Sequence, residues 1–377
     1  MRTILLAASA ALALALPLAA EEATKPAAPA PSEIVAAAPR KDWVLIPAED
    51  LLVMTLAPDT DGKPRQVVIQ LMPAPFSQGW VHNIRLFARS GWYDGISVNR
   101  VQDNYVTQWG DPNYDNPEAT GKPKPLPEGL KAMTEAEYLA PDLLAVPDPR
   151  GRPRMNYSLG ATMIRNAMIA TNGGVVVPEA FRQALQTGTP PASEEPPRMG
   201  DAYADFVTLA LGWPLGGTMG DEGNPFWPVH CYGMVGVGRN YSPDTGSGAE
   251  LYTVIGHAPR HLDRNIALVG RVIEGMEHLS SLPRGSGALG FYTAEEAGKR
   301  TAITSVRVVA DLPASEQPAF EYLSTESETF AAYAQAVANR RDPFFIVPAG
   351  GADICNIRVP VRRVVEQAWA APPRSPN

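Results

Sequence analysis

The sequence has few cysteines, no excess of basic residues and no long apolar run beyond its first twenty residues. Cys231 and Cys355 are the only cysteines in 377 residues, so a disulfide-rich scaffold and a CxxC metal or redox site are excluded. The chain has 32 Lys and Arg against 40 Asp and Glu, a formal net charge of −8, whereas proteins that bind nucleic acid present a basic surface. The composition therefore argues against nucleic acid as a partner.

The two cysteines leave two interpretations open. They lie far apart in the sequence, and Cys231 falls in an apolar run of the kind that forms buried strands. Free cysteines are common at such buried positions, and the sequence favours this interpretation. A disulfide between Cys231 and Cys355 is the alternative, because an oxidising compartment would permit it.

The first twenty residues have the pattern of a secretory signal peptide. Arg2 precedes an apolar run from Ile4 to Leu18, and two alanines close the run. The run is short for a membrane span, so cleavage would leave a periplasmic or secreted chain with no stable membrane span. An uncleaved N-terminal anchor is the alternative. Residues 21–45 are rich in Ala and Pro and are expected to form a tether.

Proline and glycine are abundant, with 38 and 32 residues, which favours a fold with many turns over a helical bundle. Asp50–Leu56 and Arg65–Leu71 are rich in apolar and β-branched residues and flank a turn-rich segment, which predicts a β-hairpin. Phe76–Ala88 then places large apolar side chains at helical spacing, so we expect a helix that ends before Gly91.

The most informative stretch is residues 90–112, which read SGWYDGISVNRVQDNYVTQWGDP. Arg100 lies in a strand-like run, and Tyr105, Val106 and Gln108 follow it at short offsets. This order resembles the segment of cyclophilin-type peptidyl-prolyl isomerases that reads G-Y-Y-D-G-hydrophobic-x-x-R-V-x-x-x-F-x-x-Q-G-G-D-P. An arginine in a strand is most often a surface residue, so its spacing alone does not indicate catalysis.

A second block supports the same resemblance. Residues 250–276 contain ELYTVIG, then HLD, then VGRVIEGM. Cyclophilins carry S-Q-F-F-I, a turn with Leu-Asp and F-G-x-V-x-x-G-M in that order. Two blocks in the same order, with compatible strands between them, make the sequence similar to this family.

The resemblance implies a mainly β fold, a closed eight-stranded antiparallel barrel capped by two helices. The cyclophilin-like domain would span residues 46–312, with an insertion at about 113–212, and the barrel pattern would resume near Gly216. Residues 313–377 would form a C-terminal extension. Further elements are predicted from periodicity and flanking residues: helices at Gly160–Ile169, Pro178–Gln186, Gly275–Leu282 and Glu328–Asn339, a final edge strand at Ile303–Val309, and short strands at Phe344–Val347 and Ile354–Val361.

The resemblance also implies a set of site residues. Arg100 matches the catalytic arginine of the family, and Gln108 matches the glutamine that positions the arginine or the substrate. The remaining matched positions would contact the substrate: Tyr105, Val106, Gly238, Arg239, Glu250, Tyr252, His261 and Leu262.

The chemistry of this family suits such residues. An X-Pro bond isomerises slowly because rotation breaks amide resonance, over a barrier of about 18–20 kcal/mol. An apolar slot for the proline ring and a fixed guanidinium can stabilise the twisted amide, so no nucleophile, metal or cofactor is needed. We therefore expect a peptidyl-prolyl cis-trans isomerase that assists the folding of exported proteins, with flexible X-Pro segments as its partners.

Departures from the family pattern keep other functions open. Glu250 replaces a glutamine and could restrain Arg100 or neutralise it, Tyr105 replaces a phenylalanine, and Trp109 replaces a glycine. These changes favour the alternative of a proline-peptide-binding or chaperone module without catalysis. A third hypothesis makes the insertion an interaction domain and the barrel its scaffold. His257 and His261 are separated by Pro259, which argues against a helical metal site.

Overall fold

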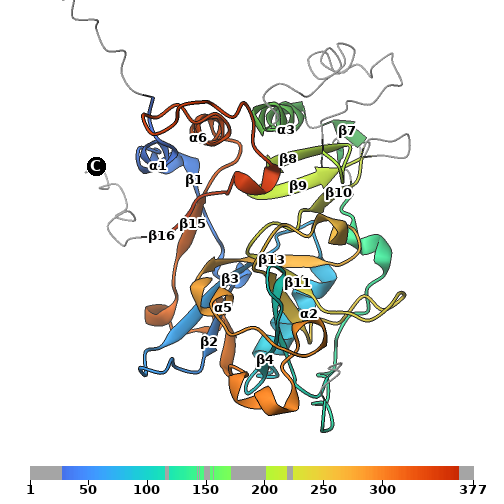
Figure 1. Ribbon diagram of the computed structural model, residues 1–377. Coiled ribbons are helices and arrows are strands. Elements are labelled where there is room, and N and C mark those ends of the chain that lie inside the picture. The colour runs from blue at the N-terminus through green and yellow to red at the C-terminus, as the bar shows by residue number, and fades with distance from the viewer. Residues whose placement is uncertain are drawn as a thin grey trace, which may run out of the picture.

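The structure is a computed structural model that describes residues 28–114, 119–141, 143, 145–147, 153–155, 157–170, 201–218 and 224–364. Its central feature is an eight-stranded antiparallel sheet in the strand order β14-β2-β3-β13-β11-β12-β5-β4 (Figure 1). The strands have these bounds: β2 (Leu51–Leu56), β3 (Arg65–Leu71), β4 (Ser97–Val101), β5 (Val106–Gly110), β11 (Met234–Val237), β12 (Leu251–Val254), β13 (Leu268–Glu274) and β14 (Ile303–Val308).

Backbone hydrogen bonds join the two outer strands and close the sheet into a barrel. The N–H of Ile303 donates to the carbonyl of Ile96 at 2.8 Å, and the N–H of Val98 donates to the carbonyl of Thr301 at 2.9 Å. The predicted eight-stranded barrel is thus confirmed. The prediction of a final edge strand is wrong, because β14 pairs with β2 on one side and meets the start of β4 on the other.

Two helices cover the barrel as predicted, although they differ in length. Helix α2 (Gln78–Arg89) buries Trp80, Ile84 and Phe87 completely. It ends before Gly91, whose φ of 69° is the left-handed conformation that glycine adopts without strain. The second helix, α5 (Glu277–Ser280), is a single turn, because Gly275 before it has a φ of 81° and Pro283 follows soon after.

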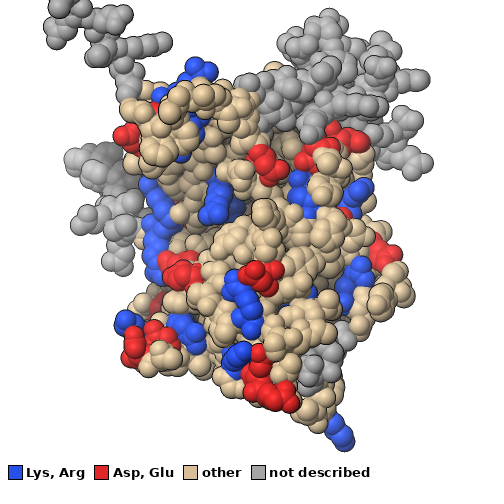
Figure 2. Space-filling model, in the orientation of Figure 1, with Lys and Arg blue, Asp and Glu red and all other residues tan. Residues whose placement is uncertain are grey.

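Lys and Arg groups are interspersed with Asp and Glu groups on the face of the molecule in Figure 2. Charged side chains of the described residues form ion pairs, such as Arg307 with Asp94 at 2.7 Å and Arg89 with Asp311 at 2.8 Å. Exposed pairs of this kind contribute little to stability. The fold therefore depends mainly on its apolar core.

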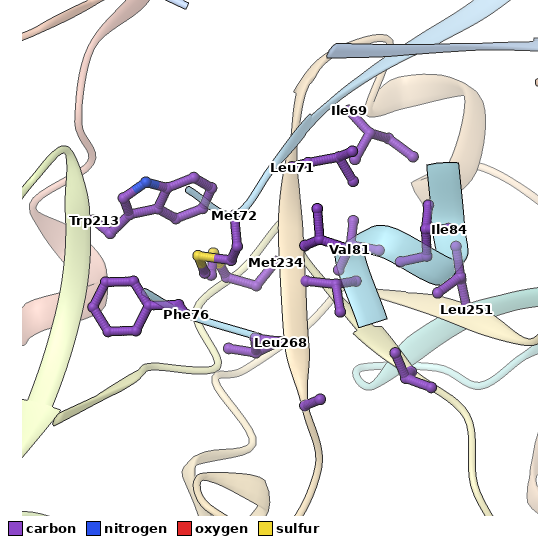
Figure 3. Packing of buried hydrophobic residues seen from close by; sticks show 14 of the residues in the cluster. Ile69, Leu71, Met72, Phe76, Val81, Ile84, Trp213, Met234, Leu251 and Leu268 are labelled. Carbon is purple, nitrogen blue, oxygen red and sulfur yellow. The ribbon is translucent and has the colours of Figure 1, made fainter. Parts of the chain in front are cut away.

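That core extends from the barrel into the inserted residues. Val81 and Ile84 of α2 pack toward the strands that carry Ile69 and Leu71, whereas Trp213 lies against Met72 and Phe76 (Figure 3). Full burial of one such aliphatic side chain stabilises a fold by about 1.5–3 kcal/mol. Trp213 is completely buried and belongs to β9, which pairs outside the barrel, so the insertion continues past residue 212 and shares one core with the barrel.

The insertion contributes its own elements. They are β6 (Ala145–Pro147), β7 (Pro153–Met155), α3 (Tyr157–Ala170), β8 (Phe206–Ala210), β9 (Trp213–Gly217) and β10 (Phe226–Pro228). The helix predicted at Gly160–Ile169 is confirmed by α3, and the helix predicted at Pro178–Gln186 lies outside the described residues. The barrel does not resume near Gly216, because β9 pairs with β8 and β10 in a separate sheet, and the next barrel strand is β11.

The extension and the N-terminal residues form a second small sheet, in the order β1-β15-β16. Its elements are α1 (Pro31–Ala36), β1 (Trp43–Leu45), β15 (Phe320–Leu323), α6 (Glu328–Ala338) and β16 (Val361–Arg363). Residues 31–36 and 43–45 are therefore not a tether, because Trp43 is buried beneath Arg362 and β1 pairs with β15. Helix α6 matches the helix predicted at Glu328–Asn339.

The two strands predicted in the extension are wrong. Residues 344–347 form turns with exposed side chains between Pro343 and Pro348, which cannot donate to a strand ladder. The range predicted from 354 to 361 begins with a 3₁₀ turn, Ile354–Asn356, and only its last residue belongs to β16.

Buried polar contacts fasten the insertion to the extension and to the barrel. Asn166 of α3 donates through Nδ2 to the carbonyls of Leu209 (2.7 Å) and Thr325 (3.0 Å). Arg271 of β13 donates to the carbonyl of Gly212 at 2.8 Å and lies 4.2 Å from the ring centre of Trp213. Burial lowers the pKa of Arg271 to about 10. These contacts make the inserted and appended segments one layer against the barrel (Figure 1).

A disulfide between Cys231 and Cys355 joins this layer to the barrel covalently. The prediction of free cysteines is therefore wrong. The two positions are 124 residues apart in sequence, yet their Cα atoms are 5.1 Å apart, because the extension folds back over the chain just before β11. The number of residues between two cysteines does not indicate whether the fold brings them together in space.

We expect the double substitution Cys231→Ala and Cys355→Ala to lower the free energy of unfolding by about 2–5 kcal/mol, because the disulfide closes a long loop in the unfolded chain. Denaturant unfolding under non-reducing conditions measures this difference. A reducing agent should then destabilise the native protein and leave the double variant unchanged. Equal midpoints for both proteins without reductant would contradict the prediction.

Candidate functional site

The β4–β5 hairpin positions the two residues predicted to be catalytic. Arg100 of β4 lies opposite Gln108 of β5, next to an irregularity in register after Val98. The Nη1 group of Arg100 donates to Oε1 of Gln108 at 3.0 Å. The sequence spacing of these residues therefore corresponds to a direct contact across two strands.

Three contacts hold the guanidinium of Arg100. Besides Gln108, its Nε donates to the carbonyl of Leu289 at 2.7 Å, and its Nη2 donates to Oε1 of Gln102. The Cζ atom lies 5.5 Å from the ring centres of both Tyr105 and Phe291. Burial lowers the pKa of Arg100 from its ordinary value, which leaves the group charged at neutral pH.

Glu250 acts on the arginine through Gln108. The Nε2 group of Gln108 donates to Oε2 of Glu250 at 2.9 Å, and both side chains are buried. A carboxylate can only accept, so Glu250 fixes the amide of Gln108 with its oxygen toward Arg100. The result is a chain of hydrogen bonds in the order Arg100, Gln108, Glu250.

These residues border a pocket with a volume of about 530 Å³. All of the predicted site residues except His261 line it. Val106 and Tyr252 pack with Val254 in a small apolar cluster of their own, with Tyr105 and Ile266 against it. The pocket thus has an apolar floor and a polar wall formed by the arginine.

His261 lies beside the pocket rather than in its lining. Its ring is exposed and stacks against Tyr105, with ring centres 6.5 Å apart and an angle of 10° between the planes. Leu262, the next residue, does line the pocket. His261 therefore belongs to the outer rim.

Gly238 and Arg239 also line the pocket. A Cβ atom on Gly238 would lie 2.9 Å from Cβ of Glu250, so the close approach of the two strands requires glycine. The side chain of Arg239 donates through Nε to the carbonyl of Asn265 at 2.9 Å and through Nη1 to that of Asn240 at 2.6 Å. Arg239 thereby connects two loops of the rim.

The segment around Leu289 is a part of the site that the sequence did not reveal. Leu289 and Phe291 line the pocket, although they lie far beyond Arg100 in the chain. Leu289 has a φ of 55°, and a Cβ on Gly290 would lie 2.7 Å from Cα of Gln102. The only local signal is the glycine-rich composition of this turn. Ala119, Asn240 and Ile266 also line the pocket.

Comparison with protein families decides the assignment. The sequence matches the model of the family described as cyclophilin type peptidyl-prolyl cis-trans isomerase over residues 60–148 and 164–308, more than half of the chain. The chain belongs to this family. It is accordingly a peptidyl-prolyl cis-trans isomerase, a class of enzyme whose substrates are proline-containing peptides.

One solved structure shares this fold. The cyclophilin AquaCyp293 from Hirschia baltica has a TM-score of 0.54 and 18% identity, and the match covers 86% of this chain and 94% of that protein. A Cryptosporidium parvum cyclophilin, crystallised in the presence of the dipeptide Ala-Pro, has a TM-score of 0.31 and 9% identity over 68% of this chain and 98% of its own. None of the curated proteins compared with the sequence matches it.

A buried network lies beneath the pocket of this cyclophilin. His230 Nδ1 is 2.8 Å from Oδ1 of Asp263, and His230 Nε2 is 2.9 Å from the hydroxyl of Tyr252. Because the carboxylate must accept, Nδ1 carries the proton and Nε2 accepts from Tyr252. Arg260 extends the network, donating to Asp263 at 2.6 Å and to Asp201 at 2.9 Å. A residue at the end of the insertion is thus connected to the pocket floor.

Trp109, a departure from the family pattern, and Asn99 both have structural roles in this cyclophilin. Trp109 is buried in the main core. Asn99 is buried and donates through Nδ2 to the carbonyl of Gly110 at 3.0 Å. Among the residues that the structure describes, no group of three or more His, Cys, Asp and Glu could hold a metal ion, and no helix is long and apolar enough to cross a membrane.

We expect the stability of the protein to fall as the pH drops below about 6.5, the ordinary pKa of histidine. Burial is the main cause that lowers the pKa of His230, so the folded state binds fewer protons than the unfolded state in this range. A single group contributes a slope of up to about 1.4 kcal/mol per pH unit.

Denaturant unfolding at several pH values between 7 and 5 measures this slope. The substitution His230→Gln should flatten it, whatever its effect on stability at pH 7, because glutamine does not titrate. The exposed His82→Gln serves as the matched control and should keep the native slope. A native slope in His230→Gln would show that another group causes the acid sensitivity.

Proposed function

We propose that the pocket binds X-Pro segments and that Arg100 stabilises the twisted amide during isomerisation. The observation that supports this proposal is the fixed guanidinium at the edge of an apolar floor. Leu289, Gln108 and Gln102 each accept one hydrogen bond from it. Its orientation is therefore set before any substrate binds, which is the condition for effective electrostatic stabilisation.

The held guanidinium retains donors for a substrate. Arginine has five N–H groups, and the three contacts leave one hydrogen on each terminal nitrogen. These hydrogens can donate to the amide nitrogen or carbonyl of a proline residue in the pocket. Donation to the nitrogen favours its pyramidal form, in which amide resonance is lost. This hydrogen bond forms fully only in the transition state, so it lowers the barrier to rotation.

The floor of the pocket suits a proline ring. Tyr252 is buried and its hydroxyl bonds to His230, so it offers the pocket its ring rather than a polar group. Val106 is buried beside it. A proline ring in this position buries apolar surface while few polar groups lose their hydration. Binding therefore does not require a charged substrate.

We propose that the substrates are exported proteins and that the enzyme acts in the periplasm or outside the cell. The signal-peptide pattern of residues 1–20 supports this location. The Cys231–Cys355 disulfide supports it independently, because such bonds persist in oxidising compartments.

One observation favours the alternative of a proline-binding module without useful turnover. All three guanidinium nitrogens of Arg100 already have protein acceptors, and the Glu250 carboxylate lies one hydrogen bond further away. Such contacts can weaken donation to a substrate. In that case the pocket would bind X-Pro peptides and leave their isomerisation rate near its uncatalysed value.

We expect Arg100→Ala to lower kcat/KM for a short X-Pro peptide by about 10²–10³-fold, the usual effect of removing one preorganised donor. A proline-isomerisation assay measures the rate. Arg89→Ala removes an exposed arginine that pairs with Glu49 and Asp311 away from the pocket, and should leave the rate unchanged.

The assay also separates the two functions. A native protein that binds the peptide, but is no faster than buffer, would establish the binding module. Equal catalysis by the native protein and by Arg100→Ala would support the isomerase function and contradict the proposed role of Arg100.

We expect Glu250→Gln to raise kcat/KM by about two- to tenfold, or roughly 0.4–1.4 kcal/mol in the activation barrier. A glutamine can still accept from Gln108, so the geometry is kept, whereas the negative charge that acts on Arg100 is removed. Glu250→Ala loses the acceptor as well and should lower kcat/KM. Equal activity in all three proteins would show that Glu250 has no influence on the arginine.

A further inference from the structure

Residues 344–347, Phe-Phe-Ile-Val, form an exposed apolar tip in the extension. Their side chains are 84%, 38%, 96% and 78% exposed. Single exposed apolar residues are ordinary on a protein surface. Among the described residues, no other run of large exposed apolar side chains is as long. This tip is therefore a feature that needs an explanation.

The tip is held in shape by the residues before it. Arg340 donates to both carboxylate oxygens of Asp342, at 2.6 and 2.9 Å, and its Cζ lies 4.3 Å from the ring centre of Phe345. The N–H of Phe345 donates to the carbonyl of Asp342 at 3.0 Å, and the N–H of Gly350 donates to Asn339 Oδ1 at 3.2 Å. The loop is thus tied at its base, while its apolar side chains face outward.

The charge beside the tip is positive. Asp342 is buried and its carboxylate is paired with Arg340, whereas Arg341 is exposed. Pro343 and Pro348 flank the four apolar residues and have no N–H groups. Their presence reduces the number of backbone donors that would lose water if the tip entered an apolar phase.

The position of the tip adds a third observation. The segment after α6 lies at the end of the molecule formed by α1, α6 and α3, away from β4 (Figure 1). Uncharged residues cover most of the surface over α1 and α6, with Lys or Arg groups and an Asp or Glu group at its edges (Figure 2). Helix α1 packs against α6, so the described part of the chain begins at this same end.

We propose that the apolar tip inserts into the surface of a lipid bilayer that contains anionic headgroups. Aromatic and aliphatic side chains beside an arginine match the interfacial region, where rings lie at headgroup level and cations meet anionic lipid. A projecting loop needs no groove in its partner, which suits a bilayer better than a protein. Membrane docking at this end leaves β4 and the Arg100 pocket facing away from the lipid.

Vesicle binding tests the proposal with the exported protein, its N-terminus determined by mass spectrometry. We expect it to sediment with phosphatidylcholine vesicles that contain 30% phosphatidylglycerol and to bind pure phosphatidylcholine several-fold less. The double substitution Phe344→Ser and Ile346→Ser should lower the partition coefficient about tenfold or more, because two exposed apolar side chains lose their burial. Arg341→Glu should weaken binding to the anionic vesicles alone.

A matched control removes apolar residues elsewhere. Leu126 and Leu139 are 40% and 36% exposed in the described part of the insertion, and their double substitution to serine should leave binding unchanged. All variants should keep native unfolding midpoints. Unaltered vesicle binding after Phe344→Ser and Ile346→Ser would overturn the proposal. Self-association of the native protein that the same substitutions abolish would also overturn it, because the tip would then contact a second copy of the chain.

A local measurement distinguishes the tip from the N-terminal residues, should these remain attached. Phe344→Trp adds an indole to the tip. With vesicles of brominated lipid, the fluorescence of this variant should be quenched more than that of the native protein, whose own tryptophans give the background signal. Absence of additional quenching, while the protein is bound to vesicles, would show that the N-terminal residues carry the binding and that the tip stays in water. The outcome is independent of the isomerase assay, because the tip residues lie outside the pocket.

Discussion

Closure of the barrel between β4 and β14 is the constraint on which the site depends. The pairing of residues 96–98 with residues 301–303 brings the end of the cyclophilin domain to the strand that carries Arg100. The segment that leads into β14 must therefore pass along β4. The N–H of Tyr292 donates to the carbonyl of Asn99 at 3.0 Å, and Phe291 bridges to Arg100. Closure and these contacts together place the carbonyl of Leu289 where it orients the guanidinium.

The insertion packs into the core of the barrel and is not an independent domain. Trp213 completes the core beside Phe76, and Asp201 holds Arg260, which in turn holds Asp263 beneath the pocket. Buried charges are stable only when each one is paired, so loss of Asp201 would leave Arg260 with one carboxylate fewer. The inserted residues therefore support the floor of the pocket from behind.

Local motifs explain which parts of the structure could be predicted. The side chains of Arg100 and Gln108 meet across one hairpin, so their spacing in sequence encodes their contact. Leu289 contributes a main-chain carbonyl, which any residue could supply, and no side-chain pattern reveals it. The free-cysteine prediction failed because the proximity of Cys231 and Cys355 depends on how the extension returns. Short pieces such as β1 were missed because their strand partner lies at the other end of the chain.

The pairing of β1 with β15 has a consequence for the order in which the protein can fold. Trp43 lies opposite Leu323, and α1 rests on α6, so the first described elements have no partners until nearly the whole chain has been synthesised. Contacts between such distant segments form late, because the entropy of closing the intervening loop must be overcome first. Strand β1 and helix α1 consequently acquire their partners β15 and α6 only late in synthesis, after the barrel strands are already available to pair.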